Sequence, residues 1–257
     1  MKRVSDADIA AVVVRSELHP LIEALQEELS YPNPGHKGRP DKVGGSLPRD
    51  EGGGESDAVF RRLEDAESIR EWKDDHRYDL IPKLTEKQKE RLDQYKRSSL
   101  YHGPLNDYLR TGTYDKAVSG WKNTKEMGSA IKEIDTALAK TQIPENITVF
   151  RGMPSEILPE NAVGVEFRDD GYGSTSLDYK MAEKFARWTR EDGFTPAIVE
   201  IRVPKGTEGI FMDELWDNGE SEILLPRGTS YRVISDVQKP VAGINGGVRH
   251  LVVEIMK

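Results

Sequence analysis

The sequence predicts an α+β fold in which helices come first and an antiparallel β core follows. Up to about residue 144 the apolar residues recur at helical spacing, whereas after it short β-rich runs alternate with turn residues. The 257 residues, of which 36% are hydrophobic, can bury one good-sized core. We therefore expect an N-terminal helical segment over residues 1–30, a flexible linker over 31–56 and one folded domain over 57–257.

Composition limits the partners and the surroundings of the protein. Its net charge of −8 should repel nucleic acid and anionic membrane surfaces, so neither is expected as a partner. Cysteine is absent from the sequence, which excludes disulfides, cysteine-bound zinc and thiol nucleophiles and fits a reducing cytoplasm. The first apolar run, residues 9–14, is too short for a signal peptide or a membrane span. The five histidines show no ligand spacing, and no metal is expected.

The first half of the chain is predicted to form helices around a polar linker. Residues 5–29 carry apolar side chains at helical spacing, with a break expected near Pro20. Residues 31–56 are dominated by glycine, proline and charge, so they cannot bury enough apolar surface to offset their ordering entropy. Further helices are predicted over residues 57–76, 85–99, 105–110 (LNDYLR) and 125–141.

The second half is predicted to form strands, with one helix over residues 178–188. Asn245 and Gly246 precede the last strand, and both tolerate the positive φ of a type I′ turn. We therefore expect an antiparallel hairpin that turns at this pair. The predicted strands are residues 147–152, 171–176, 197–203, 222–228, 230–235 and 249–256.

Two glutamates open the strand predicted at residues 222–228. Glu220 and Glu222 are two residues apart, and such residues of a strand face the same side, so both carboxylates are expected in one space. An E-x-E pair alone is a weak motif among 45 acidic residues, and a solvated strand end is the alternative. The preceding loop carries Trp216 and Phe211, which we expect to be exposed beside the acids and to grip a substrate.

Hydroxyls and a guanidinium form two further motifs. In GYGSTS, Ser174 and Ser176 share one strand face and could line a polar cleft, although Ser176 or Asp178 also suits the cap of the following helix. Arg151 continues a row of apolar side chains in ITVFRG, so it requires an anionic partner, either a ligand or a structural carboxylate. Gly152 permits close approach of backbone or ligand.

Taken in chain order, these motifs resemble the ADP-ribosyltransferase exoenzyme family, which includes binary-toxin enzyme components, VIP-type insecticidal toxins and C3-like exoenzymes. The resembling segments are LNDYLR, VFRG, GYGSTSLDYKMAEKFA and GESEILLPRGTSYRV, and the resemblance covers roughly residues 95–257. It implies an antiparallel two-sheet mixed core preceded by helices, with NAD⁺ as substrate. Residues 1–56 lie outside it, and GHKGRPDKVGGSLP within them is loosely similar to linkers of phage virion proteins.

The resemblance also implies roles for single residues. Glu222 would stabilise the oxocarbenium-like transition state as nicotinamide leaves, and Arg151 would pair with a phosphate of the dinucleotide. Ser174 would hold the ribose or orient Glu222. Further dinucleotide contacts implied by the resemblance are Thr175, Ser176, Tyr108 and Arg110, with packing in an amphipathic helix as the alternative for the last two. In the loop of residues 187–196, the candidates for contacting nicotinamide are Arg187, Arg190 and Phe194.

The residue two positions before the catalytic glutamate implies the acceptor. In the family's pattern a glutamate there accompanies arginine acceptors and a glutamine accompanies asparagine acceptors, and this chain has Glu220. A carboxylate suits arginine because the guanidinium must be gripped and partly deprotonated before it attacks.

The expected function is a mono-ADP-ribosyltransferase that modifies an arginine of a target protein in the cytoplasm of a target or host cell. Two alternatives stay open: an NAD glycohydrolase, and a non-catalytic binding or virion protein on the same fold. Residues 1–56 leave room for a delivery partner or a virion contact.

Overall fold

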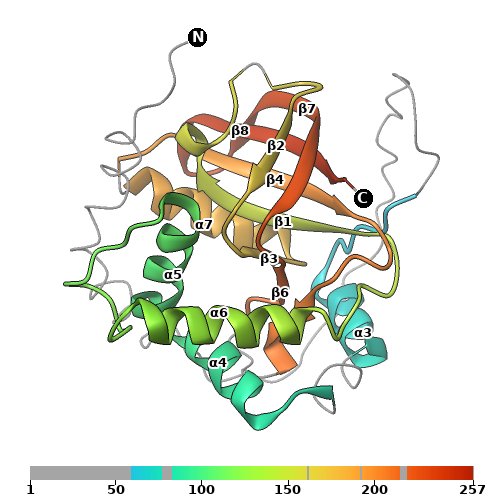
Figure 1. Cartoon of the computed structure of the whole chain (residues 1–257). Coiled ribbons are helices and arrows are strands. Elements are labelled where there is room, and N and C mark those ends of the chain that lie inside the picture. Colours follow the sequence, from blue (N-terminus) through green and yellow to red (C-terminus); the bar gives the residue numbers. More distant parts are fainter. Residues whose placement is uncertain (1–58, 77–82, 161, 192, 215–218, 257) are drawn as a thin grey trace, which may run out of the picture.

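The computed structural model describes residues 59–76, 83–160, 162–191, 193–214 and 219–256. The N-terminal helical segment and the linker expected over residues 1–56 lie outside these ranges. Helices α4, α5 and α6 lie together beside β3 and β6, whereas α7 packs on β1 and β4 (Figure 1). The helices are α3 (Ala66–His76), α4 (Glu86–Arg97), α5 (Ser99–Thr111), α6 (Thr124–Leu138) and α7 (Tyr179–Glu191).

The strands of the described residues form one mixed sheet in the order β2-β7-β8-β4-β1-β3-β6-β5. All neighbours are antiparallel except β4 and β8. β1 meets β3 through one pair, Phe150 and Ser176, so a five-stranded part joins a three-stranded part there. These parts correspond to the two sheets expected, and the α+β class is confirmed. The strands are β1 (Ile147–Pro154), β2 (Glu166–Asp169), β3 (Gly173–Ser176), β4 (Pro196–Val203), β5 (Ile210–Phe211), β6 (Glu222–Leu225), β7 (Thr229–Val241) and β8 (Ile244–Ile255).

The helices bury their apolar faces against the two parts of the sheet. Leu92, Leu105 and Ile134 of the helical layer are fully buried in a cluster that includes Leu224 of β6. α7 lies so close to β1 that a Cβ on Gly152 would come within 2.2 Å of the Ala182 carbonyl oxygen. Glycine at this position therefore accommodates the helix backbone.

Local signals fix where α4 and α5 begin and end. Thr85 caps α4 in a capping box with Gln88, as two reciprocal hydrogen bonds show. Ser98 has an extended backbone, so it ends α4, and its hydroxyl accepts the Leu100 N–H to cap α5. The consequence is a sharp change of direction after Arg97, which brings both helices onto the three-stranded part of the sheet.

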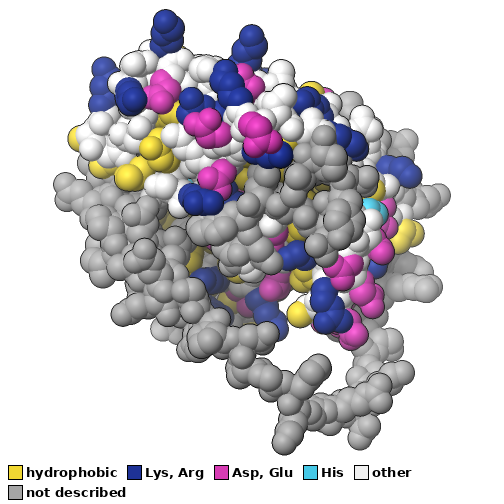
Figure 2. All heavy atoms as spheres, turned by 90° about the horizontal axis from the view of Figure 1, so that it is seen from below, with side chains coloured by type: hydrophobic (Ala, Val, Ile, Leu, Met, Phe, Trp, Pro, Cys, Tyr) yellow, Lys and Arg dark blue, Asp and Glu magenta, His cyan; other side chains and the backbone are white. Residues whose placement is uncertain are grey.

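The surface seen from below mixes both signs of charge. Figure 2 shows Lys and Arg side chains next to Asp and Glu side chains on this view. Ion pairs such as Lys87 with Glu133 at 2.7 Å and Arg227 with Asp135 at 2.9 Å join the elements. Among the residues described, no helix is long and apolar enough to cross a bilayer.

Two local expectations are wrong. The helix predicted from residue 57 begins only at Ala66, because the backbone of Arg61 pairs with β1: its N–H donates to the Asn146 carbonyl and its carbonyl accepts from Thr148, both at 2.9 Å. The set of strands is also incomplete, because β2 and β5 were not predicted. Both are short, and edge strands as brief as these leave little periodic signal.

The hairpin turn also lies earlier than expected. Val241 pairs with Ile244, so the chain turns at residues 242–243, where Gly243 has a φ of 81°. Asn245 and Gly246 lie inside β8, next to a register shift that accommodates the extra residues as a bulge. The antiparallel pairing itself is as predicted.

Candidate active site

β3 and β6 place hydroxyls beside a buried carboxylate. Ser176 pairs in register with Glu222, and the Ser174 Oγ donates to the Glu222 Oε1 at 2.5 Å. The Ser176 Oγ donates to the Glu220 carbonyl oxygen at 2.6 Å, and Thr175, on the other face, donates to a carbonyl of β6 at 2.7 Å. All three hydroxyls therefore hold β6 and its preceding turn against β3. Ser176 also accepts the Asp178 N–H at 2.9 Å, and Asp178, directly before α7, accepts the Lys180 N–H at 2.9 Å, so Asp178 holds the capping position.

The two glutamates do not share one strand face, contrary to expectation. β6 begins at Glu222, and Ser221 before it has a φ of 49°, which is uncommon for a residue other than glycine. The Asp213 carboxylate, in the 3₁₀ turn Met212–Glu214, accepts the N–H groups of Ser221 at 2.9 Å and of Glu222 at 3.2 Å. A turn held by Asp213, and not strand alternation, therefore sets the position of Glu220.

A buried lysine reaches the same carboxylate and was not singled out from the sequence. The Lys96 Nζ lies 3.2 Å from the Glu222 Oε2 and 3.0 Å from the Asp213 Oδ1. Burial alone would lower the pKa of Lys96, but the attraction of Glu222 and Asp213 raises it above its ordinary value. A signal did exist, because Gln88, Leu92 and Tyr95 are buried with Lys96 at helical spacing, which places it on the core side of α4.

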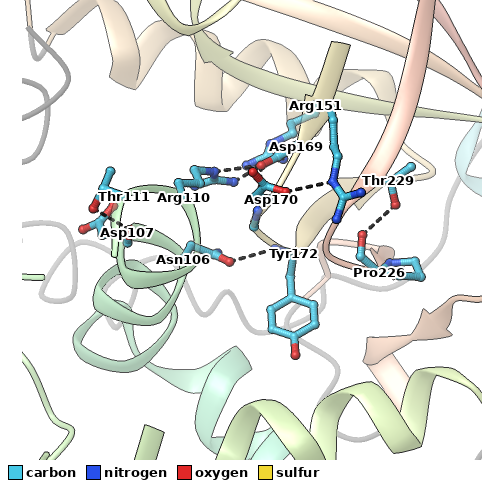
Figure 3. Close-up of polar contacts among 12 residues, drawn as sticks. Asn106, Asp107, Arg110, Thr111, Arg151, Asp169, Asp170, Tyr172, Pro226 and Thr229 are labelled. Carbon is cyan, nitrogen blue, oxygen red and sulfur yellow. Dashed lines mark hydrogen bonds and ion pairs between the residues drawn. The ribbon is translucent and has the colours of Figure 1, made fainter. Parts of the chain in front are cut away.

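Two arginines expected to bind the dinucleotide converge on one carboxylate. Arg110 of α5 donates to both oxygens of Asp169 at 2.8 and 3.0 Å, and the Arg151 Nη1 lies 3.3 Å from its Oδ2 (Figure 3). Burial would raise the pKa of Asp169, but the two guanidinium groups hold it below its usual value. A Cβ on Gly171 would lie 2.6 Å from the Arg110 Nη2, so this glycine makes room for the guanidinium. The structural carboxylate considered for Arg151 is therefore present, and it is shared.

Asn106 of α5, which sequence reasoning missed, links α4 to the residue before β3. Asn106 donates to the Tyr95 hydroxyl at 2.9 Å. It also accepts the Tyr172 N–H at 2.8 Å (Figure 3). Tyr108 packs edge-on against Tyr114, with ring centroids 6.2 Å apart, which supports the packing alternative for it.

The remaining candidates lie on or after α7, on β5, or outside the described residues. Arg187 and Arg190 are exposed on α7, and Phe194 is half-buried beyond its end. Phe211 is half-buried against Trp72, with ring centroids 5.8 Å apart, so it is less exposed than expected. Trp216 lies outside the described residues. Within the described ranges, no group of three or more potential ligand side chains could hold a metal ion.

The architecture is that of ADP-ribosyltransferase toxins. Plx2a from Paenibacillus larvae matches with a TM-score of 0.60 and 23% identity, over 77% of this chain and 100% of that one. C3stau2 from Staphylococcus aureus, solved with NAD, matches with a TM-score of 0.57 and 20% identity, over 78% of this chain and 100% of that one.

The chain belongs to the ADP-ribosyltransferase exoenzyme family, whose model matches residues 69–256. Mono-ADP-ribosyltransferase C3 of Clostridium botulinum C phage is 30% identical over 127 residues, which cover 42% of this chain and 50% of that protein. The chain therefore aligns with half the length of this curated relative. The family expected from the ordered motifs is confirmed, and its match begins well before residue 95.

Proposed function

We propose that the protein is a mono-ADP-ribosyltransferase that cleaves NAD⁺ and transfers its ADP-ribose to an arginine side chain of a target protein. Family membership supports the reaction class. The observation that carries the proposal is the buried Glu222, hydrogen-bonded by Ser174 and preceded by Glu220 across a fixed turn.

Glu222 supplies the charge that the chemistry requires. The bond between the ribose carbon and the nicotinamide nitrogen breaks with its electron pair going to the cationic ring, so the leaving group is neutral and needs no general acid. Positive charge develops on the ribose, and a preorganised carboxylate stabilises it. Ser174 holds one oxygen of Glu222, which fixes the direction of the carboxylate toward the ribose.

Arg110 and Arg151 bind the phosphates of the dinucleotide. A planar guanidinium suits phosphate oxygens in two-point contacts, and both groups already lie side by side on Asp169. The negative charge of Asp169 offsets the repulsion between the two guanidinium groups. It also holds them in place, so that their remaining N–H groups can donate to a ligand. Arg110, Arg151 and Asp169 together carry a net positive charge, which a phosphate can neutralise.

Glu220 acts on the acceptor. A nitrogen of the target arginine forms the new bond to the ribose carbon and gives up a proton, and a carboxylate beside it can hold the guanidinium and accept that proton. Glu220 lies two residues before Glu222, with its carbonyl bound by Ser176, so the backbone that carries the two glutamates is fixed at the turn. The target is proposed to be a protein in the cytoplasm of a target or host cell.

One assay tests the proposal. The protein is incubated with labelled NAD⁺, with and without agmatine as an arginine-like acceptor, and in parallel with a chelator. We expect nicotinamide release, an ADP-ribosyl-agmatine product by mass spectrometry, and no loss of either in the chelator. Nicotinamide release with no acceptor product, also against arginine-bearing proteins of a lysate, would make the protein an NAD glycohydrolase. No release at all would refute the proposal.

A further inference from the structure

A buried cation lies against the carboxylate to which the proposed function gives the central role, and the inference below rests on that function. The Lys96 side chain is 1% exposed, and its Nζ lies between the Glu222 Oε2 and the Asp213 Oδ1. Ser174 binds the other oxygen of Glu222. Each oxygen of this carboxylate therefore has its own donor, one from α4 and one from β3.

The surroundings of Glu222 hold more acid than base at close range. Asp213 faces it from the 3₁₀ turn, and Glu220 precedes it in the loop. The charges of Asp213 and Glu220 act on Lys96 together with that of Glu222, and Lys73 of α3 touches the far oxygen of Asp213 at 3.2 Å. Lys96 is the cation within contact of Glu222 in the described structure. Without Lys96, the negative charges of Glu222 and Asp213 would be buried together with too little positive charge beside them.

Lys96 also acts on the turn that separates the two glutamates. Its second partner, Asp213, accepts the backbone N–H groups of Ser221 and Glu222, and thereby holds Ser221 at a positive φ. The Asp213 side chain is 1% exposed, so a cation beside it compensates the charge where water does not reach.

We infer that Lys96 is a positioning residue for the transfer reaction: it compensates the charge of Glu222 and aims this carboxylate from the side opposite to Ser174, and through Asp213 it fixes the turn that carries Glu220. At 1% exposure, the Lys96 side chain is assigned no contact with substrate. Its effect is on the electrostatic surroundings and the direction of Glu222, which acts on the substrate.

The experiment compares Lys96→Met, Lys96→Arg and the wild-type chain in NAD⁺ hydrolysis, with kcat and KM measured from acidic to alkaline pH. Lys96→Met should lower kcat by roughly 10- to 100-fold at acidic pH, the loss expected from one charge-assisted hydrogen bond, with little change in KM. In the Lys96→Met variant, the acidic limb of the kcat–pH profile should move to higher pH, because a carboxylate without a neighbouring cation takes up a proton more readily. Lys96→Arg should return the limb toward its wild-type position, since it restores the cation.

The matched control is Lys89→Met, the same chemical change on the same helix, where the lysine pairs with Glu86 at 2.8 Å on the surface. Its pH profile should equal that of the wild type. If Lys96→Met does not fold by circular dichroism, Lys96→Gln, which removes the charge and keeps an N–H donor, takes its place in the comparison.

The outcomes separate this inference from the proposed function. An unchanged acidic limb in the uncharged Lys96 variant, whatever its kcat, overturns the positioning role and leaves the function standing. A loss that is equal at every pH also overturns it, because it marks a structural ion pair. A wild-type chain that releases no nicotinamide refutes the function itself.

Discussion

The Ser174 Oγ donates to the Glu222 Oε1 at 2.5 Å, and this contact joins two strands whose residues lie 48 apart in the chain. The register explains it. Ser176 is directly opposite Glu222, and Ser174 lies two residues further on the same face, within diagonal reach. The carboxylate is buried while the serine side is open, so a ligand can approach Glu222 from the side of Ser174.

Glu222→Gln should abolish both nicotinamide release and transfer, with a loss of at least about a hundredfold in kcat, because no charge remains to stabilise the oxocarbenium. NAD⁺ binding should survive, since Arg110 and Arg151 are untouched. Nicotinamide release by chromatography and binding by calorimetry measure the two effects. Glu90→Gln, at an exposed position of α4, is the control and should behave as wild type. A Glu222→Gln variant that still releases nicotinamide contradicts the assignment.

Glu220→Gln should fail differently. Transfer to arginine should be lost, while hydrolysis of NAD⁺ continues, because water needs no grip on a guanidinium. The contact of Ser176 with the Glu220 carbonyl is made by the backbone and should persist in the variant. Nicotinamide release and agmatine labelling are followed in the same reaction. Labelling of agmatine at the wild-type rate would show that Glu220 does not handle the acceptor.

Arg151→Lys should weaken NAD⁺ binding by roughly tenfold, because an ammonium replaces a planar fork of donors with a point charge. The matched control is Arg168→Lys on β2, where the arginine is exposed and pairs with Asp170 at 2.8 Å. Its affinity should stay at the wild-type value. Calorimetric titration compares the dissociation constants, and equal weakening in both variants would point to a general charge effect.

His250 should make the folded state sensitive to mild acid. Burial, with the nearby cations Lys239 and Arg62, lowers the pKa of His250 from 6.5 to about 4. As the pH falls through this window the unfolded chain gains a proton that the folded chain refuses, so stability decreases, by at most roughly 3 kcal/mol, and levels off below the folded pKa. Above pH 6.5 the residue contributes no slope.

The variant His250→Gln tests this prediction, because its side chain does not titrate. Urea unfolding at several pH values should show a shallower loss of stability between pH 6.5 and about 4 than in the wild type. Parallel curves for the two proteins in this window would mean that His250 is protonated when folded.

A chain that begins at Asp57 should fold and keep its activity. It retains Arg61, whose backbone pairs with the start of β1, and it retains all residues of the candidate site. Limited proteolysis of the full chain should cut first within residues 31–56, where glycine and proline are frequent. If the shortened chain does not fold, residues 1–56 belong to the core, and no separate role in delivery or virion contact can be assigned to them.

The sequence was most informative where the signal is local. The helix expected over residues 85–99, the strand carrying Arg151 and the STS strand fall where predicted, because side-chain periodicity acts over a few residues. Local signals also misled. Asn245 and Gly246 suit a hairpin turn, yet Gly243 nearby suits one as well, and the pairing of β7 with β8 chose between them.

The charge partners could not be predicted in the same way. Asp169 gave no motif, although it joins Arg110, 59 residues before it, to Arg151. Lys96 lies 117 residues from Asp213 and 126 from Glu222, so a pattern of neighbouring residues can place it on a helix face but cannot name its partners.

The sequence by itself determined the family, the order of helices and strands, and the residue types that the proposed chemistry needs. The tertiary structure alone decided that Lys96 meets Glu222, that Asp213 holds the turn at Ser221, and that two arginines share Asp169. The physical reason is range. Backbone preferences and side-chain alternation are fixed between neighbours in the chain, whereas a buried ion pair exists only where packing brings distant charges together and excludes water.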